Sequence, residues 1–276
     1  MNTSSKPTLP SPKAVRFSTT IGKNKPETLV TGRSECPFCH PESLVDIVET
    51  DGDIIFLKNK YNVLTDAEQF VLVESRRCDD GIEQYSSEKL HRLFRLALRH
   101  FDRMLKNPDY KSVIFFKNHG PLSGGTIRHP HMQIIGFYDI EPETLYEKDN
   151  FVPADNPIIQ RDGITLSASA FPRLGFGEFT IISDAYPLSE KSIDTLADLI
   201  QYVVRFLLKL DWRENPSYNL FFYYLQDRRQ LALRIMPRHP TSPLFVGYDL
   251  RIVPDNIGLL SEKLKEFILE NISRKS

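Results

Sequence analysis

Long apolar segments are missing from this chain of 276 residues. No stretch approaches the roughly 20 consecutive apolar residues that a membrane-spanning helix requires, and the N-terminus has no apolar signal core. We therefore expect a cytoplasmic protein without a membrane partner. Residues 1–14, rich in serine, proline and threonine, are expected to form a disordered lead-in.

An excess of basic charge is also missing, because 35 Lys and Arg residues stand against 36 Asp and Glu residues and the net charge is -1. A domain that binds nucleic acid usually carries a basic excess. The charge balance therefore argues against nucleic acid as a partner, although a local basic site for a phosphate is still allowed. A content of 41% hydrophobic and 26% charged residues is typical of a globular protein with a sizeable core.

Cysteine is scarce, with Cys36, Cys39 and Cys78 as the three residues of this type. An odd number of cysteines in a reducing compartment argues against a disulfide framework. The Cys-x-x-Cys spacing of Cys36 and Cys39 is found in zinc sites and in redox pairs. From the spacing alone, a metal site, a redox pair and a structural role all stay open.

The middle of the chain contains two similar halves. In each half an amphipathic helix, beginning near Ser86 or near Ser189, is followed by a polar loop and two apolar strands. We interpret this order as a duplicated α+β unit, with antiparallel sheets and helices on one side. The predicted strands are 53–57, 70–74, 112–116, 133–137, 179–182, 218–223 and 231–236, and a last helix is predicted at 259–268.

We assign the first unit to residues 15–150 and the second to residues 151–276. Aligning the two halves sets Arg234 opposite His131, and the polar residues around His131 have no counterparts in the second half. We therefore expect one active site, in the first half, with the second half as support or substrate wall.

Polar side chains gather where the first unit leads into its last strand. His129, His131 and Gln133 alternate, so on a strand they would project from the same face. Two imidazoles and an amide on an otherwise apolar strand are costly to bury without a function. A neutral imidazole next to phosphate-binding donors can attack phosphorus and form a phosphoramidate.

The loop before this strand is suited to such donors. Gly124 and Gly125 let the backbone approach a ligand closely, and the nearby N–H groups can face phosphate oxygens. A lone His-x-His run is often metal-binding or incidental, and a Gly-Gly pair is usually a turn, but their union in one segment favours catalysis. Further donors are available from Asn118, Ser123, Thr126 and Arg128.

The run His129-Pro130-His131-x-Gln133, preceded by Asn118-x-Gly120 and Gly124-x-Thr126, resembles the galactose-1-phosphate uridylyltransferase branch of the histidine triad (HIT) superfamily. It resembles more closely an uncharacterised bacterial family of that branch, from about Lys25 to Leu264. The resemblance implies a HIT-like fold of two half-barrel-type units, and a homodimer. It also takes in Cys36-Pro37-Phe38-Cys39, Asn59-Lys60-Tyr61 and Phe245-Val246-Gly247-Tyr248-Asp249.

The same resemblance implies roles for individual residues. His131 would take a nucleotidyl group from a nucleotide sugar or a dinucleotide, and Gln133 would bind the phosphoryl oxygens of the covalent intermediate. Asn118 and Thr126 would hold phosphates, and Asn59 would lie near the ribose and base. Members of the superfamily with Gln in the position of Gln133 tend to transfer, whereas those with His tend to hydrolyse. The family's His-x-His pair in the second half is missing here, so no second metal is expected.

A structural zinc site is a further implication. In the resembling family it joins a Cys-x-x-Cys pair, a histidine that follows a strand, and the first histidine of His-Pro-His. Cys78 stands where that strand-following histidine is usual, with His119, His40 or no metal at all as alternatives. Four thiolate and imidazole ligands close a tetrahedron and leave no position for water. The predicted zinc ligands are Cys36, Cys39, Cys78 and His129.

Three functions are compatible with these features. The first is transfer of a nucleotide from a nucleoside phosphate or nucleotide sugar to phosphate or a sugar phosphate. The second is hydrolysis by a HIT-type nucleotide hydrolase, and the third is nucleotide binding by a zinc-braced protein without turnover. Among the other residues, His91 and His100 are expected on the surface of the first helix, and Lys25 belongs to an arm that often lies near phosphate in the family.

Overall fold

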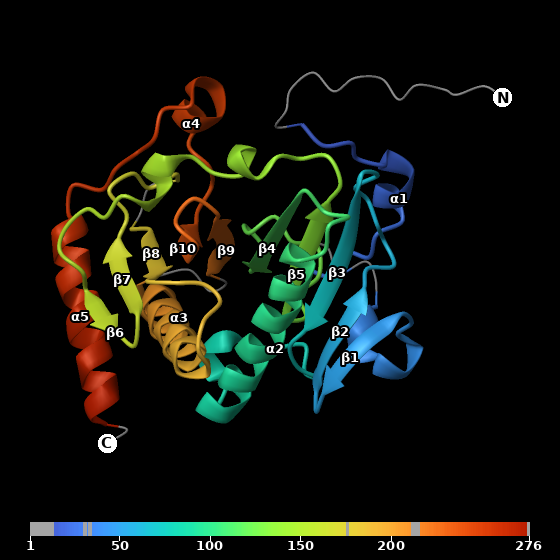
Figure 1. Ribbon diagram of the computed structural model, residues 1–276, viewed down its shortest axis with the longest axis horizontal. Coiled ribbons are helices and arrows are strands. Elements are labelled where there is room, and N and C mark those ends of the chain that lie inside the picture. Colours follow the sequence, from blue (N-terminus) through green and yellow to red (C-terminus); the bar gives the residue numbers. More distant parts are fainter. Residues whose placement is uncertain (1–13, 30–31, 33–34, 175–176, 211–215, 275–276) are drawn as a thin grey trace.

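The computed structural model describes residues 14–29, 32, 35–174, 177–210 and 216–274, so the predicted lead-in lies outside it except for Ala14. Ten strands of these residues form one antiparallel sheet, in the order β1-β2-β3-β5-β4-β9-β10-β8-β7-β6. The order of the second half mirrors that of the first about the central β4–β9 pair (Figure 1). This arrangement confirms the predicted α+β fold of two similar antiparallel units.

The sequence pattern predicts seven of the ten strands in place, although most are longer than predicted, and it misses those at 47–51, 159–161 and 164–168. The strands of the first unit are β1 (Ile47–Asp51), β2 (Ile54–Lys58), β3 (Ala67–Val73), β4 (Ser112–His119) and β5 (His131–Phe137). Those of the second unit are β6 (Ile159–Arg161), β7 (Ile164–Ala168), β8 (Phe179–Ser183), β9 (Ser217–Leu225) and β10 (Gln230–Arg238).

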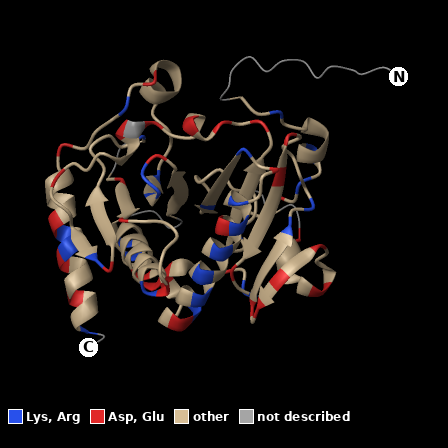
Figure 2. Ribbon diagram, in the orientation of Figure 1, with Lys and Arg blue, Asp and Glu red and all other residues tan. Residues whose placement is uncertain are grey.

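Two long helices, α2 (Ser87–Leu105) and α3 (Glu190–Leu210), cover one face of the sheet (Figure 1). Ser86 caps the start of α2 by accepting a hydrogen bond from the backbone N–H of Lys89. The outward side of α2 carries basic residues, with acidic residues of neighbouring elements close by (Figure 2). The remaining helices are α1 (Thr19–Lys23), α4 (Pro243–Tyr248) and α5 (Ile257–Ser273). Among the helices described, none is both long and apolar enough to cross a membrane.

The two faces of the first unit differ in what they bury. Side chains alternate along a strand, so Leu72, Met132 and Phe115 point under the helices into the main core. Their neighbours in sequence point to the opposite face, where a smaller apolar cluster includes Leu57 and Val71. The helix-free face is therefore the one that remains available for a ligand.

Two buried ion pairs lie among the strands. Lys117 Nζ is 2.5 Å from Glu74 Oε1, and both side chains are fully buried. In the second unit the guanidinium of Arg234 contacts the Glu178 carboxylate, again without access to solvent. A buried charge is costly without its partner, and here each charge has one. Arg234, which aligns with His131, is therefore neutralised by Glu178 and closed to solvent.

The expectation that His100 lies on the surface is wrong. Its ring stacks on Phe56 with a centroid separation of 3.8 Å, and its Nε2 lies 2.9 Å from a Glu49 carboxylate oxygen. Burial lowers its pKa. His91 agrees better with the expectation, because it lies partly exposed beside Asp198.

Candidate functional site

The His-Pro-His run divides into two parts. Strand β5 begins at His131, so His131 and Gln133 share the helix-free face, whereas His129 precedes the strand and turns elsewhere. Pro130 has no N–H for the ladder, although its carbonyl accepts the N–H of Glu74 at 3.1 Å. The predicted alternation of three polar residues on one strand face therefore holds for two of them.

A hydrogen bond fixes the tautomer of His131. Its Nδ1 lies 2.7 Å from the backbone carbonyl oxygen of His129. Because a carbonyl can only accept, Nδ1 carries the proton and Nε2 keeps its lone pair. Burial, aided by the charges of Lys117 and Lys25, lowers the pKa of His131 to about 4. At neutral pH this side chain is an uncharged imidazole with a free nitrogen.

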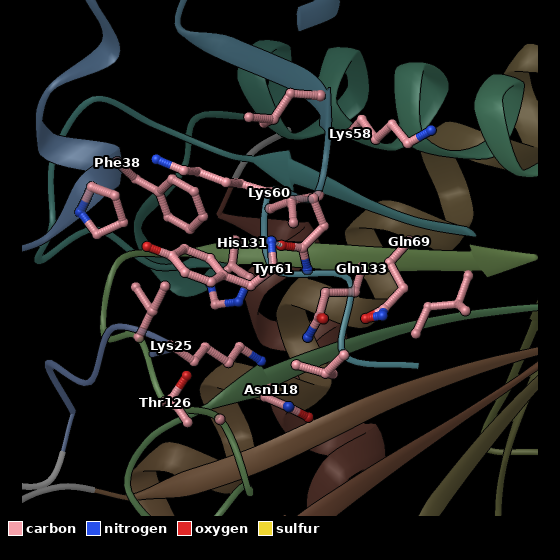
Figure 3. Close-up of a pocket in the computed structure, with 18 of the residues that line it drawn as sticks. Lys25, Phe38, Lys58, Lys60, Tyr61, Gln69, Asn118, Thr126, His131 and Gln133 are labelled. Atoms are coloured by element: carbon pink, nitrogen blue, oxygen red, sulfur yellow. Dashed lines mark hydrogen bonds between the residues drawn. The ribbon is translucent and has the colours of Figure 1, made fainter. Parts of the chain in front are cut away.

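A cavity of about 340 Å³ opens at His131, on the helix-free face of the sheet (Figure 3). This volume lies within the usual range for pockets that bind small molecules. Strands β3, β5 and β4 form its floor and contribute the polar side chains of Gln69, Gln133 and Asn118, and the rest of the lining is partly polar and partly apolar. The apolar walls include Phe38, Leu44, Val45, Leu57, Val63, Val71 and Phe116.

Most of the predicted substrate-binding residues line this cavity, together with His131 and Gln133. Ser123 and Arg128 are the exceptions. The hydroxyl of Ser123 donates to the Gly120 carbonyl at 2.7 Å and so shapes the loop, and Arg128 is exposed outside the lining. The lining residues among the predicted set are Asn59, Asn118, Gly124, Gly125 and Thr126.

The two glycines of the loop have structural reasons to be glycine. Gly124 has a φ of +85°, which is unfavourable for other residues. A Cβ on Gly125 would lie 3.2 Å from Asn118 Cβ, which is tighter than ordinary contact. The loop can therefore lie close to Asn118, and within it the Gly125 N–H lies 3.4 Å from the Ser123 hydroxyl oxygen.

Lys25 supplies positive charge at the same place. Its ammonium group points toward His131 and Asn118 (Figure 3), and its charge contributes to the lowered pKa of His131. Burial lowers the pKa of Lys25 itself. No side chain among the described residues forms a hydrogen bond or ion pair with this ammonium. A partly buried cation with no counter-ion among the described residues, in the cavity that Gly124, Gly125 and Thr126 also line, suits a phosphate.

Gln69 is a lining residue that the sequence interpretation did not select. Its side chain projects into the cavity from β3 (Figure 3), it is only 3% exposed, and its Nε2 has no hydrogen-bond partner among the described residues. One signal was available, because Gln69 is in phase with Val71 and Val73 and is therefore polar on an otherwise apolar strand face. Buried amides are normally paired, so a bound ligand is the natural partner.

Beside the cavity, four side chains form a group that could hold a metal ion. The ligand atoms of Cys36, Cys39, Cys78 and His129 all lie within 4.8 Å of one another. Cys39 Sγ is 3.5 Å from His129 Nδ1, and His129 Nε2 donates to the Ser75 carbonyl at 2.7 Å. This donation leaves Nδ1 free for a metal, which is the usual outer-shell arrangement of a histidine ligand.

The thiols of this group are crowded in a way that a cation would relieve. Burial, together with the neighbouring thiols, raises the pKa of Cys78 to about 12, and burial raises that of Cys36. A bound divalent ion reverses this effect by holding the thiolate forms. The donor set of three sulfurs and one imidazole nitrogen fits a closed tetrahedral site.

The two alternative ligands lie elsewhere. His119 stacks on Tyr218 with a centroid separation of 4.6 Å, and burial lowers its pKa to about 3. His40 is half exposed and pairs with Glu42. Phe38 lies between the metal group and the cavity, 5.8 Å from the ring centre of His129 and 5.5 Å from that of His131.

Solved structures show where this fold has been seen before. An ADP-glucose phosphorylase from Arabidopsis thaliana, solved with bound ADP-glucose, aligns with a TM-score of 0.69 at 15% identity, over 94% of this chain and 97% of that chain. A uridylyltransferase aligns with a TM-score of 0.68 at 13% identity, over 87% of this chain and 93% of that chain. At these identities the likeness shows the fold, and it confirms the expected galactose-1-phosphate uridylyltransferase-like, HIT-type architecture.

A structure of a DUF4931 family protein from Bacillus cereus is much more similar in sequence, with 39% identity over 80% of this chain and 99% of that chain and a TM-score of 0.69. No curated protein matches the chain. The models described as the N-terminal and C-terminal domains of "Domain of unknown function (DUF4931)" match residues 17–140 and 147–269. The two matches together span most of the sequence, and the chain therefore belongs to the DUF4931 family.

Proposed function

We propose that this protein is a nucleotidyltransferase or phosphorylase that acts on a nucleotide sugar or a dinucleotide, through a covalent nucleotidyl intermediate on His131. The observation that carries the proposal is the state of His131, an uncharged imidazole whose free Nε2 faces a cavity with phosphate-type donors. The similar structures named above include a uridylyltransferase and an ADP-glucose phosphorylase with a nucleotide sugar bound, which supports the choice.

The proposed reaction has two displacements at one phosphorus atom. In the first, His131 Nε2 attacks the α-phosphorus of the donor, a P–N bond forms, and the bond to the leaving group breaks; this group is the sugar phosphate of a nucleotide sugar or the second nucleotide of a dinucleotide. The imidazole then carries a positive charge, which the hydrogen bond from Nδ1 to the His129 carbonyl stabilises. In the second, an acceptor phosphate oxygen attacks the same phosphorus, the P–N bond breaks, and neutral His131 is regenerated.

Gln133 favours a phosphate acceptor over water in this scheme. It lies one strand repeat beyond His131 on the same face. Its neutral amide can donate a hydrogen bond to a phosphoryl oxygen but transfers protons poorly. Attack by water needs proton transfer, whereas a phosphate oxygen already carries negative charge. The covalent intermediate is therefore expected to persist until an acceptor enters beside residues 124–126.

The metal proposed for the cysteine group is zinc, one ion per chain. Cys36, Cys39, Cys78 and His129 would hold it, and with four protein ligands it would be structural. Its contribution to the reaction would be indirect. By holding His129, it would fix the carbonyl that accepts the Nδ1–H of His131.

Intact-mass measurement after incubation with nucleotide sugars and dinucleoside polyphosphates tests the proposal. A matching donor should add the mass of one nucleotidyl group to the protein. Inorganic phosphate or a sugar phosphate should then discharge this adduct about 10²–10⁴ times faster than water. This is the factor that general acid–base catalysis typically contributes, and attack by water would lack it here.

The same experiment separates the two competing functions. A hydrolase would release free nucleotide steadily, and the adduct would decay at a rate that no phosphate acceptor changes. A protein that only binds nucleotide would retain it without any change of covalent mass. Either result would replace transfer as the function.

Gln69→Leu is expected to separate ligand binding from stability. Leucine has a similar volume and removes a buried donor that has no partner among the described residues, so the melting temperature should not fall. A ligand that pairs with the Gln69 amide should bind about 10- to 100-fold more weakly, equivalent to about 1–3 kcal/mol for an unpaired polar group. Calorimetric titration with the donor identified above measures this, and unchanged affinity would show that Gln69 has no part in recognition.

Gln226→Glu is the control variant for these affinity and stability measurements. Gln226 is an exposed amide that does not line the cavity. Neither ligand affinity nor stability should change in this variant.

A further inference from the structure

A second buried amide lies across the centre of the sheet from the proposed phosphate site. Asn219, on β9, stands opposite Asn118 of β4 and is fully buried. Its Nδ2 lies 2.7 Å from Asn118 Oδ1 and 3.1 Å from the Ser123 carbonyl oxygen. Its Oδ1 accepts a hydrogen bond from Arg238 Nη1 at 2.7 Å. Neither Asn219 nor Arg238 lines the cavity.

The hydrogen bonds from Arg238 to Asn219 and from Asn219 to Asn118 run in one direction, which Arg238 fixes. A guanidinium can only donate, so the oxygen of the Asn219 amide must face Arg238 and its NH₂ group must face Asn118. The oxygen of Asn118 is then the accepting end. The NH₂ group of Asn118 is left to face the cavity, next to His131 and the loop that contains Gly125.

The same amide also holds the loop. By donating to the Ser123 carbonyl, Asn219 fixes the residue just before Gly124 and Gly125. Gly125 and Asn118 are themselves in close approach. One residue of the second unit therefore sets both the direction of the Asn118 donor and the position of the loop N–H groups.

We propose that Asn219, held by Arg238, is a positioning residue through which the second unit orients the phosphate donors of the first. The inference rests on the proposed function, because it assigns phosphate binding to Asn118 and the loop. It gives the second unit a share in the site without any contact to the substrate.

Asn219→Asp is the sharpest test, because it changes one NH₂ group to an oxygen. The carboxylate still accepts from Arg238, so the fold should be retained. It no longer donates to Asn118 Oδ1 or to the Ser123 carbonyl, and Asn118 is free to turn its NH₂ group toward the new carboxylate and its oxygen toward the phosphate. Adduct formation should fall by about 100-fold or more, as when one transition-state donor is lost.

A double-variant comparison distinguishes positioning from a merely structural effect. Because Asn219 acts partly through Asn118 and partly through the loop, Asn118→Ala combined with Asn219→Asp should lose clearly less than the product of the two single losses. Losses that multiply would overturn the inference, and so would a wild-type rate in folded Asn219→Asp. Arg238→Met, which removes the donor to Asn219 Oδ1 and so loosens the hold on this amide, should lower the rate in the same direction. A wild-type rate in that variant would also count against the proposal.

Binding of ADP and UDP gives a readout that does not depend on turnover. Asn219→Asp and Arg238→Met should each weaken binding of the tighter of these two ligands by about 10-fold or more. Gln226→Glu, an amide-to-acid change at an exposed position, should leave the affinity unchanged. If the wild-type protein forms no adduct with any donor, the proposed function fails. The positioning role of Asn219 is then judged by ligand binding alone, and equal affinities of the wild type and Asn219→Asp would overturn that role.

Discussion

His131→Ala should abolish both the nucleotidyl adduct and turnover, with a loss of roughly 10⁴- to 10⁶-fold, as found when a nucleophile or its base is removed from other enzymes. The reason is that, in the proposed mechanism, Nε2 of His131 forms the P–N bond. Replacement of a buried imidazole leaves a cavity but no unpaired charge, because His131 is neutral in the folded protein. Intact-mass analysis with the best donor measures the adduct directly.

His91→Ala is the matched control. It removes another imidazole of the first unit, on α2, where His91 Nε2 contacts Asp198 at 3.1 Å. The adduct should form at the wild-type rate in this variant. Persistence of an adduct in folded His131→Ala would move the covalent step to another residue and remove the central element of the proposed mechanism.

Purified protein should contain one zinc ion per chain, and Cys78→Ser should lose most of it. A structural zinc site contributes to folding directly, with apparent binding free energies of about 10–16 kcal/mol in small zinc domains. If only about 4 kcal/mol of this is lost, the melting temperature should fall by roughly 8–16 °C. Elemental analysis and thermal unfolding measure the two effects.

The rival ligand provides the control for this experiment. His40 follows Cys39 directly but pairs with Glu42, outside the group. His40→Ala should therefore keep a full complement of zinc. Stoichiometric zinc in Cys78→Ser would remove Cys78 from the ligand set, and zinc well below one per chain in protein made without chelators would remove the site.

The spacing of residues in the sequence predicts the candidate site better than it predicts the fold around the site. Cys36 and Cys39 are joined by a single turn of 3₁₀ helix, and His129 and His131 by one proline. Local spacing of this kind survives folding. The pairing of Cys78 with His129 came from the resemblance, and the register explains it. Because Val73 pairs with His131, the residues after β3 lie beside those before β5.

Other parts of the site depend on partners that spacing does not reveal. Gln69 could have been noticed from strand phase, but the bond between Asn118 and Asn219 joins residues 101 positions apart. It required the pairing of β4 with β9, which no local pattern predicts. His100 shows the same limit, because its burial is caused by Phe56 of a different element.

The central pairing of β4 and β9 has a consequence for how the chain can be divided. Residues 115–119 of β4 pair with β9, so the first unit expressed alone would present this stretch as an open sheet edge. Unpaired backbone groups on an edge strand are templates for other chains. Such a fragment is expected to aggregate or to pair with its own copies. Closing this edge is therefore a structural reason to retain the second unit, separate from the positioning role proposed for Asn219, since the first unit alone would expose an edge on which it could self-associate.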